Sequence, residues 1–144
     1  PTLTEVYNVA LSPFLSETLP ADQAIMEASS VMKDFMVANT RSDTLLMFSD
    51  MAGADGYESN ADIPFSTLLP SFITSELKTA FQIGFLLFLP FLVIDMVIAS
   101  ILMALGMMML SPMLVSLPFK LLLFVLVDGW AMTVGSLAAT FLTP

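Results

Sequence analysis

The longest uncharged part of the chain is interrupted once, by a short stretch of turn-forming residues. Residues 96–119 carry no charge. Near their middle lies the sequence GMMMLSP, which begins with Gly106 and ends with Pro112. Glycine and proline mark turns, whereas long apolar runs are typical of helices that are hydrophobic all round. A turn at a protein surface is normally built from Asn, Asp, Ser and Gly rather than from methionine. The pattern therefore predicts a helical hairpin whose apolar turn is buried in a membrane, in an assembly or at a shared axis.

Two long helices form the predicted hairpin. We expect the first over residues 70–110, beginning at Pro70, because proline suits the start of a helix. Residues 79–94 are sixteen consecutive uncharged residues, slightly fewer than the about twenty that span a bilayer. The second helix is expected over residues 114–141. Bends or turns are expected at Pro90, Gly106, Pro112 and Pro118.

The amino-terminal part of the chain shows shorter, amphipathic patterns. Residues 21–39 place apolar side chains in steps of three and four, which predicts a helix with one buried face. Its buried positions are expected to be Ile25, Ala28, Met32, Phe35 and Met36. A second helix is expected over residues 43–52, with Ser42 as its N-cap. Its buried positions are expected to be Leu45, Leu46, Phe48 and Met51.

These patterns predict an all-α fold in two parts. Residues 1–69 form a small amphipathic helical region outside the membrane, and residues 70–144 form the hairpin of long, kinked, hydrophobic helices. The chain does not begin with methionine and shows no signal-like apolar segment at its start. We therefore expect it to be a fragment or a processed chain.

The composition is that of a membrane protein. Hydrophobic residues make up 57% and charged residues 12% of the chain, whereas ordinary globular domains carry about a quarter charged residues. Eleven of the thirteen acids lie in residues 1–78, so the net charge of −9 belongs mainly to the amino-terminal half. No basic patch suits nucleic acid. The chain has no Cys and no His, which removes disulfides, zinc sites of the usual kind, thiol catalysis and histidine acid–base chemistry. We expect no metal and no cofactor.

Three charged residues lie within the apolar helices: Asp95, Lys120 and Asp128. A charge at the bilayer centre costs roughly 2.5–3.5 kcal/mol, so such residues normally face protein or water. With the turn placed near Ser111, a straight hairpin sets Asp95 level with Asp128 and leaves Lys120 about 10 Å away. We therefore expect the partners of these charges to come from a register shifted by a kink or from another subunit. The alternative is that Lys120 extends to a polar edge while Asp95 is protonated.

Two further patterns concern packing. Small residues four apart on the second helix permit close contact between helices: Ala131, Gly135 and Ala139. Methionine usually fills gaps in a core, but successive residues of a helix point about 100° apart. Met107, Met108 and Met109 therefore cannot share one helix face. At the tip of a hairpin they could instead form a flexible apolar plug, which would seal a pore if several copies surround an axis.

From residue 64 to residue 141 the sequence closely resembles the FliP family, a core membrane component of the bacterial type III secretion export gate. Three stretches carry the resemblance, PSFITSELKTAFQIGFLLFLPFLVIDMVIAS at residues 70–100, ALGMMMLSPM at 104–113 and SLPFKLLLFVLVDGW at 116–130. Family members normally begin with further hydrophobic helices, none of which precedes Pro1 here. We therefore expect a carboxy-terminal part of a longer protein.

The resemblance implies a role without an active site. FliP-like proteins assemble as a homo-pentamer with FliQ-like and FliR-like subunits, and FliO-like, FlhB-like and FlhA-like proteins are possible further partners. The assembly conducts unfolded export substrates and lies in the bacterial inner membrane at the flagellar basal body, with residues 1–69 extracytoplasmic. Met107, Met108 and Met109 match the family's GMMM loop, which closes the channel as a gasket.

Three other interpretations remain open from the sequence. The chain could belong to the injectisome (virulence) branch of the same family rather than to the flagellar branch, although residues 95–110 and 128–141 resemble the flagellar branch more. It could be a proton-coupled transporter subunit that uses Asp95 and Asp128. An intramembrane hydrolase built on the same two carboxylates has the least support, since nothing else in their sequence context fits it.

Overall fold

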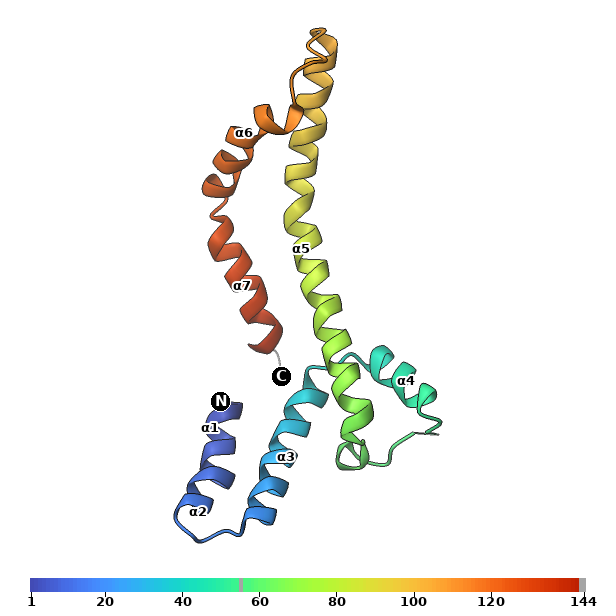
Figure 1. Ribbon diagram of the computed structural model, residues 1–144, viewed down its shortest axis with the longest axis vertical. Coiled ribbons are helices and arrows are strands. Elements are labelled where there is room, and N and C mark those ends of the chain that lie inside the picture. The colour runs from blue at the N-terminus through green and yellow to red at the C-terminus, as the bar shows by residue number, and fades with distance from the viewer. Residues whose placement is uncertain (55, 143–144) are drawn as a thin grey trace. The chain divides into compact units, whose positions relative to one another are not determined.

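The computed structural model describes residues 1–54 and 56–142, and these residues form helices and connecting turns without any strand. The predicted all-α fold is confirmed. Residue 55 of the predicted region 1–69 and residues 143 and 144 of the predicted hairpin region lie outside the described residues. The helical elements are α1 (Thr2–Val6), the π-helical turn η1 (Tyr7–Leu11), α2 (Ser12–Leu15), α3 (Ala21–Ala38), α4 (Ser42–Met51), the 3-10 turn η2 (Asn60–Asp62), α5 (Phe65–Ala104), α6 (Pro112–Leu126) and α7 (Gly129–Leu142) (Figure 1).

The chain forms two compact units, Pro1–Leu77 and Lys78–Pro144, and α5 runs from the first into the second. The predicted division at residue 69 stays a prediction. In the first unit, α1, η1 and α2 follow one another and turn back onto α3 (Figure 1). Glu17 adopts a positive φ of 59° in this turn. The hydroxyls of Ser16 and Thr18 both donate to the carbonyl oxygen of Pro13, at 3.1 and 2.9 Å, and so close the turn.

A small core joins α3 to the beginning of α5. Met36, Ile63 and Leu68 are buried together, and the ring of Phe35 meets the ring of Phe72 edge-on at 5.9 Å. The face of α5 that is buried in this unit carries small hydroxyl side chains on successive turns: Thr67, Ser71 and Ser75. Small side chains of this kind can be buried at close helix contacts when a nearby backbone group satisfies the hydroxyl.

The helix expected over residues 43–52 begins one residue earlier than predicted. α4 begins with Ser42, and Arg41 is its N-cap residue. The backbone N–H of Arg41 donates to Ser75 Oγ of α5 at 3.0 Å. The beginning of α4 is therefore fixed by a hydroxyl on another helix rather than by its own serine.

The amphipathic patterns correctly predict α3 and α4 but not every buried side chain. Met36 is buried as expected, whereas Ile25, Leu46 and Met51 are 67%, 61% and 74% exposed. The buried positions of α4 are instead the small polar residues Thr44 and Ser49. Ser49 Oγ donates to the carbonyl oxygen of Leu45 at 2.9 Å, which lets a hydroxyl occupy a close contact without an unsatisfied donor.

The first long helix begins and ends earlier than its pattern indicates. α5 starts at Phe65 because the Pro64 carbonyl accepts the N–H groups of Thr67 and Leu68, which opens the helix five residues before Pro70. It ends at Ala104 rather than at residue 110. α5 continues as one helix past Pro90, and the bend expected there stays a prediction.

The second long helix is two helices, so the single helix expected over residues 114–141 is wrong. α6 and α7 meet at a 60° bend. Asp128 lies in the break with a φ of 51°, a left-handed conformation that Asp adopts more readily than most residues because its short side chain can bond locally. Gly129 follows, buried under Phe124: a Cβ atom at Gly129 would lie 2.4 Å from two ring carbons. That ring in turn meets Trp130 edge-on at 5.5 Å and Phe91 of α5 at 6.3 Å.

Substitution of Gly129 by Ala tests this break. Because the Phe124 ring is held between two other aromatic rings, it cannot move aside freely, and we expect a loss of about 1–3 kcal/mol in the free energy of unfolding. Gly135 is the matched control, since a Cβ atom there would meet no other atom within 4 Å. Gly135→Ala should stabilise α7 by up to about 1 kcal/mol. Denaturant unfolding of the purified chain in detergent measures both, and equal effects would contradict the packing described here.

Candidate functional site: a charged pair below an apolar hairpin tip

The hairpin tip begins where glycine ends α5. Gly106 has a φ of 71°, its N–H donates to the carbonyl of Met103 at 3.1 Å, and the N–H of Met107 donates to the carbonyl of Leu102 at 2.9 Å. This pair of bonds is the Schellman arrangement, which satisfies the last carbonyl groups of a helix and needs a residue that tolerates positive φ. Pro112 then occupies the first position of α6, where proline lacks no needed hydrogen bond. Gly106 and Pro112 therefore define the turn, as the sequence predicts.

The three consecutive methionines lie in this turn. Met107, Met108 and Met109 are 46%, 77% and 100% exposed, so their side chains project from the tip rather than fill a core of this chain. Their proposed role as a gasket is not decided by that position and stays a prediction. What the geometry supplies is a set of unbranched, flexible apolar side chains on a short connection between two helices.

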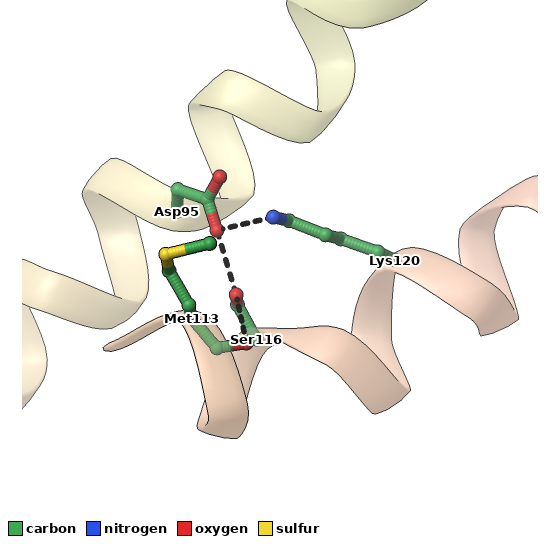
Figure 2. Close-up of polar contacts among 4 residues, drawn as sticks. All are labelled: Asp95, Met113, Ser116 and Lys120. Atoms are coloured by element: carbon green, nitrogen blue, oxygen red, sulfur yellow. Dashed lines mark hydrogen bonds and ion pairs between the residues drawn. The ribbon is translucent and has the colours of Figure 1, made fainter. Parts of the chain in front are cut away.

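A charged pair links the two helices below the tip. Lys120 Nζ of α6 lies 2.7 Å from Asp95 Oδ1 of α5, and both side chains are about three-quarters covered (Figure 2). Ser116, which is completely buried, donates its hydroxyl to the same carboxylate oxygen at 2.6 Å. The carbonyl oxygen of Met113 lies 3.1 Å from that hydroxyl, and Figure 2 shows all four residues converging between the helices.

This pairing corrects the expected register of the hairpin. Asp95 lies nine residues before the end of α5, and Lys120 lies eight residues after the start of α6, so the two are level. The expectation of about 10 Å between their levels is wrong because it placed the turn near Ser111. The centre of the seven-residue connection lies three residues earlier, at Met108. Asp95 and Lys120 therefore pair within the chain because of where the turn lies. The sequence does not indicate Ser116, because an isolated serine gives no signal.

Asp128 does not join this pair. Its side chain is exposed and makes no hydrogen bond or ion pair with the residues that the structure describes. The carboxylates of Asp95 and Asp128 therefore do not share a proton as an aspartyl catalytic pair does. Ala131, Gly135 and Ala139 lie on one face of α7 and are all exposed, and their role in helix contacts stays a prediction. No group of three residues able to hold a metal ion occurs among the described residues.

The chemistry of the pair is structural. Apolar surfaces attract each other without direction, whereas a carboxylate that accepts bonds from one ammonium and one hydroxyl fixes a single arrangement of two helices. Among the described residues, α5 is long and apolar enough to cross a membrane, and α6 with α7 meets the same criterion when the bent pair is taken together. Fold and site thus define an all-α membrane protein with an apolar helical hairpin held by a charged pair.

Comparison with known proteins identifies the family. Residues 1–137 match the FliP family, to which the chain belongs. The flagellar biosynthetic protein FliP of Cereibacter sphaeroides is 73% identical over 98% of this chain and 47% of its own length. The proteins of the same name from Bacillus subtilis and Aquifex aeolicus are 52% and 41% identical, again over 98% of this chain, and over 64% and 60% of their own lengths. The chain thus spans about half the length of the curated relatives it matches, and the family expected from its motifs is confirmed.

A double-mutant cycle tests the charged pair. Lys120→Met leaves the Asp95 carboxylate without its cation and should lower the thermal unfolding midpoint strongly. Adding Asp95→Asn removes the stranded charge, so the double variant should recover roughly half or more of the loss. The matched control is Asp128→Asn, which removes a carboxylate with no partner among the described residues and should change the midpoint little. Additive losses in the double variant would show that the pair is not coupled.

Ser116→Ala isolates the hydroxyl. It removes one donor to the carboxylate, and we expect the free energy of unfolding to fall by about 1 kcal/mol. Ser100→Ala is the control, since Ser100 is exposed and bonds only the carbonyl of Met96 in its own helix, at 2.8 Å. A local bond of that kind contributes little to a helix. Urea unfolding in detergent compares the two, and a larger effect at Ser100 would contradict a role for the buried serine.

Proposed function

We propose that this chain is part of a subunit of the bacterial flagellar protein-export gate. Its membership of the FliP family supports this proposal, as does the name flagellar biosynthetic protein that its relatives carry. In this proposal several copies surround an axis and form a channel for unfolded export substrates. The subunit performs no chemistry of its own, in keeping with the structural rather than catalytic character of the Asp95 site.

The methionine tip is the observation that carries the proposal. Met107, Met108 and Met109 stand at the tip of an apolar hairpin whose turn is fixed by the left-handed Gly106 and by Pro112. Methionine side chains are unbranched and polarizable, so they can fill an irregular gap and rearrange when its shape changes. Gathered from several copies at one axis, they would exclude water and ions at rest and move aside for a chain in transit.

The charged pair complements such a gate. A closure made of flexible side chains seals only if the backbone that carries them stays in place. Asp95, Lys120 and Ser116 hold the helices on both sides of the connection, so only the residues beyond the pair need to move. In the proposed arrangement the backbone of the hairpin is therefore fixed up to the Asp95–Lys120 pair, and the methionine side chains at the tip are free to move.

The assembly and its surroundings follow from the family resemblance. We propose a homo-oligomer, with five copies as the family implies, together with FliQ-like and FliR-like subunits and FliO-like, FlhB-like or FlhA-like proteins as further partners. The location is the bacterial inner membrane, with residues 1–69 outside the cytoplasm. The extensive apolar surface of α5 supports a position in which a membrane or other subunits cover it. Only 6% of its most apolar 18-residue stretch is buried within the chain. The injectisome branch of the family is the alternative, and the names of the relatives favour the flagellar one.

Replacing Met107, Met108 and Met109 together by Ala in the complete protein tests the gate. Alanine shortens each side chain, so we expect an assembled complex that leaks small ions, measured as conductance or dye release after reconstitution into liposomes. The matched control replaces Met26, Met47 and Met51 by Ala, three methionines of the first unit that are 70%, 47% and 74% exposed. The control complex should stay tight. An assembled tip variant that does not leak would contradict the gasket and leave the tip as packing surface.

A further inference from the structure

The first unit carries an apolar groove that none of its own described segments fills. It lies where η1 and the ends of α1 and α2 meet α3, holds about 380 Å³, and only apolar side chains line it. Ala10 and Ala24 are buried in it, whereas Phe14 and Ile25 are 43% and 67% exposed at its edges. Small side chains thus form the floor and large ones the walls. Grooves of this construction receive the apolar face of a helix.

The charges around this groove all have one sign. Residues 1–32 contain four acids and no Lys or Arg. The four acids, all exposed, are Glu5, Glu17, Asp22 and Glu27. On α3 the groove-lining stripe runs along Ala21, Ala24, Ile25 and Ala28. At 3.6 residues per turn, Asp22 and Glu27 lie roughly 110° to either side of the centre of that stripe. Asp22 and Glu27 therefore lie beyond the two edges of the apolar stripe of α3, one on each side.

We propose that this groove, the α1–α3 groove, binds an amphipathic helix of another protein that carries Lys or Arg beside its apolar stripe. The apolar residues of such a helix would cover the alanine floor, and its basic residues would meet Asp22 on one side and Glu27 on the other. Complementary charge of this kind speeds association and excludes partners of the wrong sign. The proposal does not depend on the role of the methionine tip.

A second copy of this chain fits the groove less well. It would bring thirteen acids and only four basic residues, and at least two of the four are engaged within the chain. Lys33 donates to the carbonyl of Ala61 at 2.7 Å, and Lys120 pairs with Asp95. Like charges facing one another would oppose such a contact. Anionic lipid headgroups would meet the same repulsion.

Two designed helical peptides with the same leucine stripe are the probes, one flanked by Lys and the other by Glu. They are titrated by fluorescence anisotropy against the purified chain held in non-ionic amphipol, with controls lacking protein. We expect the Lys peptide to bind about tenfold more tightly or better, and the difference to shrink in high salt because exposed charges are screened. Equal affinities for the two peptides would overturn the charge selection.

A matched pair of tryptophan variants locates the binding site. Ala21 is exposed in the first turn of α3 and lines the groove, whereas Ala38 is exposed in its last turn and does not. Ala21→Trp should fill the groove and weaken Lys-peptide binding about tenfold or more, and Ala38→Trp should leave it unchanged. Unchanged binding in Ala21→Trp would overturn the proposal.

Charge reversal separates the groove from the net charge of the chain. The double change Asp22→Lys and Glu27→Lys should invert the preference towards the Glu peptide. The control Asp34→Lys with Asp50→Lys alters the net charge equally but reverses exposed acids that do not flank the groove, and it should keep the original preference. An equal effect in both variants would show general attraction and overturn the proposal.

Sedimentation of the chain tests the second copy as the occupant. Self-association that Ala21→Trp alone abolishes would also overturn the proposal.

Discussion

The contact between Asp95 and Lys120 determines how the two arms of the hairpin align. Residues 96–119 carry no charge, so apart from Ser116 the surfaces that α5 and α6 present to each other there are mainly apolar and would tolerate sliding by one turn. A carboxylate that accepts bonds from Lys120 Nζ at 2.7 Å and Ser116 Oγ at 2.6 Å does not tolerate it, because one turn of displacement would separate the partners by about 5 Å. The Asp95–Lys120 pair thus selects one alignment of two helices that otherwise attract each other without specificity. The position of the methionine tip depends on this alignment.

Buried hydroxyl groups make several of the close helix contacts in this chain. Ser116 reaches across to Asp95, and Ser75 accepts the backbone N–H of Arg41, so that each fixes one helix against another. Ser71 satisfies its own hydroxyl on the carbonyl of Thr67 at 2.6 Å. In a chain with few charges, such short side chains supply direction at close contacts without the desolvation cost of an ion.

The sequence predicts the hairpin and its turn residues because glycine and proline act through the backbone alone. Gly106 ends α5 and Pro112 begins α6 wherever the rest of the protein lies. The predicted register of the hairpin is wrong for a different reason. Moving the assumed turn by three residues changes the distance to the turn on both helices, in opposite senses, and so changes which residues are level. The break at Asp128 also went unpredicted, although an Asp-Gly pair is a turn signal, since the apolar run continues on both sides of it. Ile25, Leu46 and Met51 were expected to be buried because a periodic pattern shows which residues share a face, not what covers that face.

Asp128 limits what can cover the α6–α7 bend. Its carboxylate is exposed and has no partner among the described residues, and it adopts a left-handed conformation that most residues avoid. A charged side chain at the bilayer centre costs roughly 2.5–3.5 kcal/mol, so contact between this carboxylate and lipid tails would be unfavourable. Water or a basic group of another protein would not. The exposed apolar side chains of α6 and α7 carry no such constraint, so lipid can cover those helices but not the carboxylate between them.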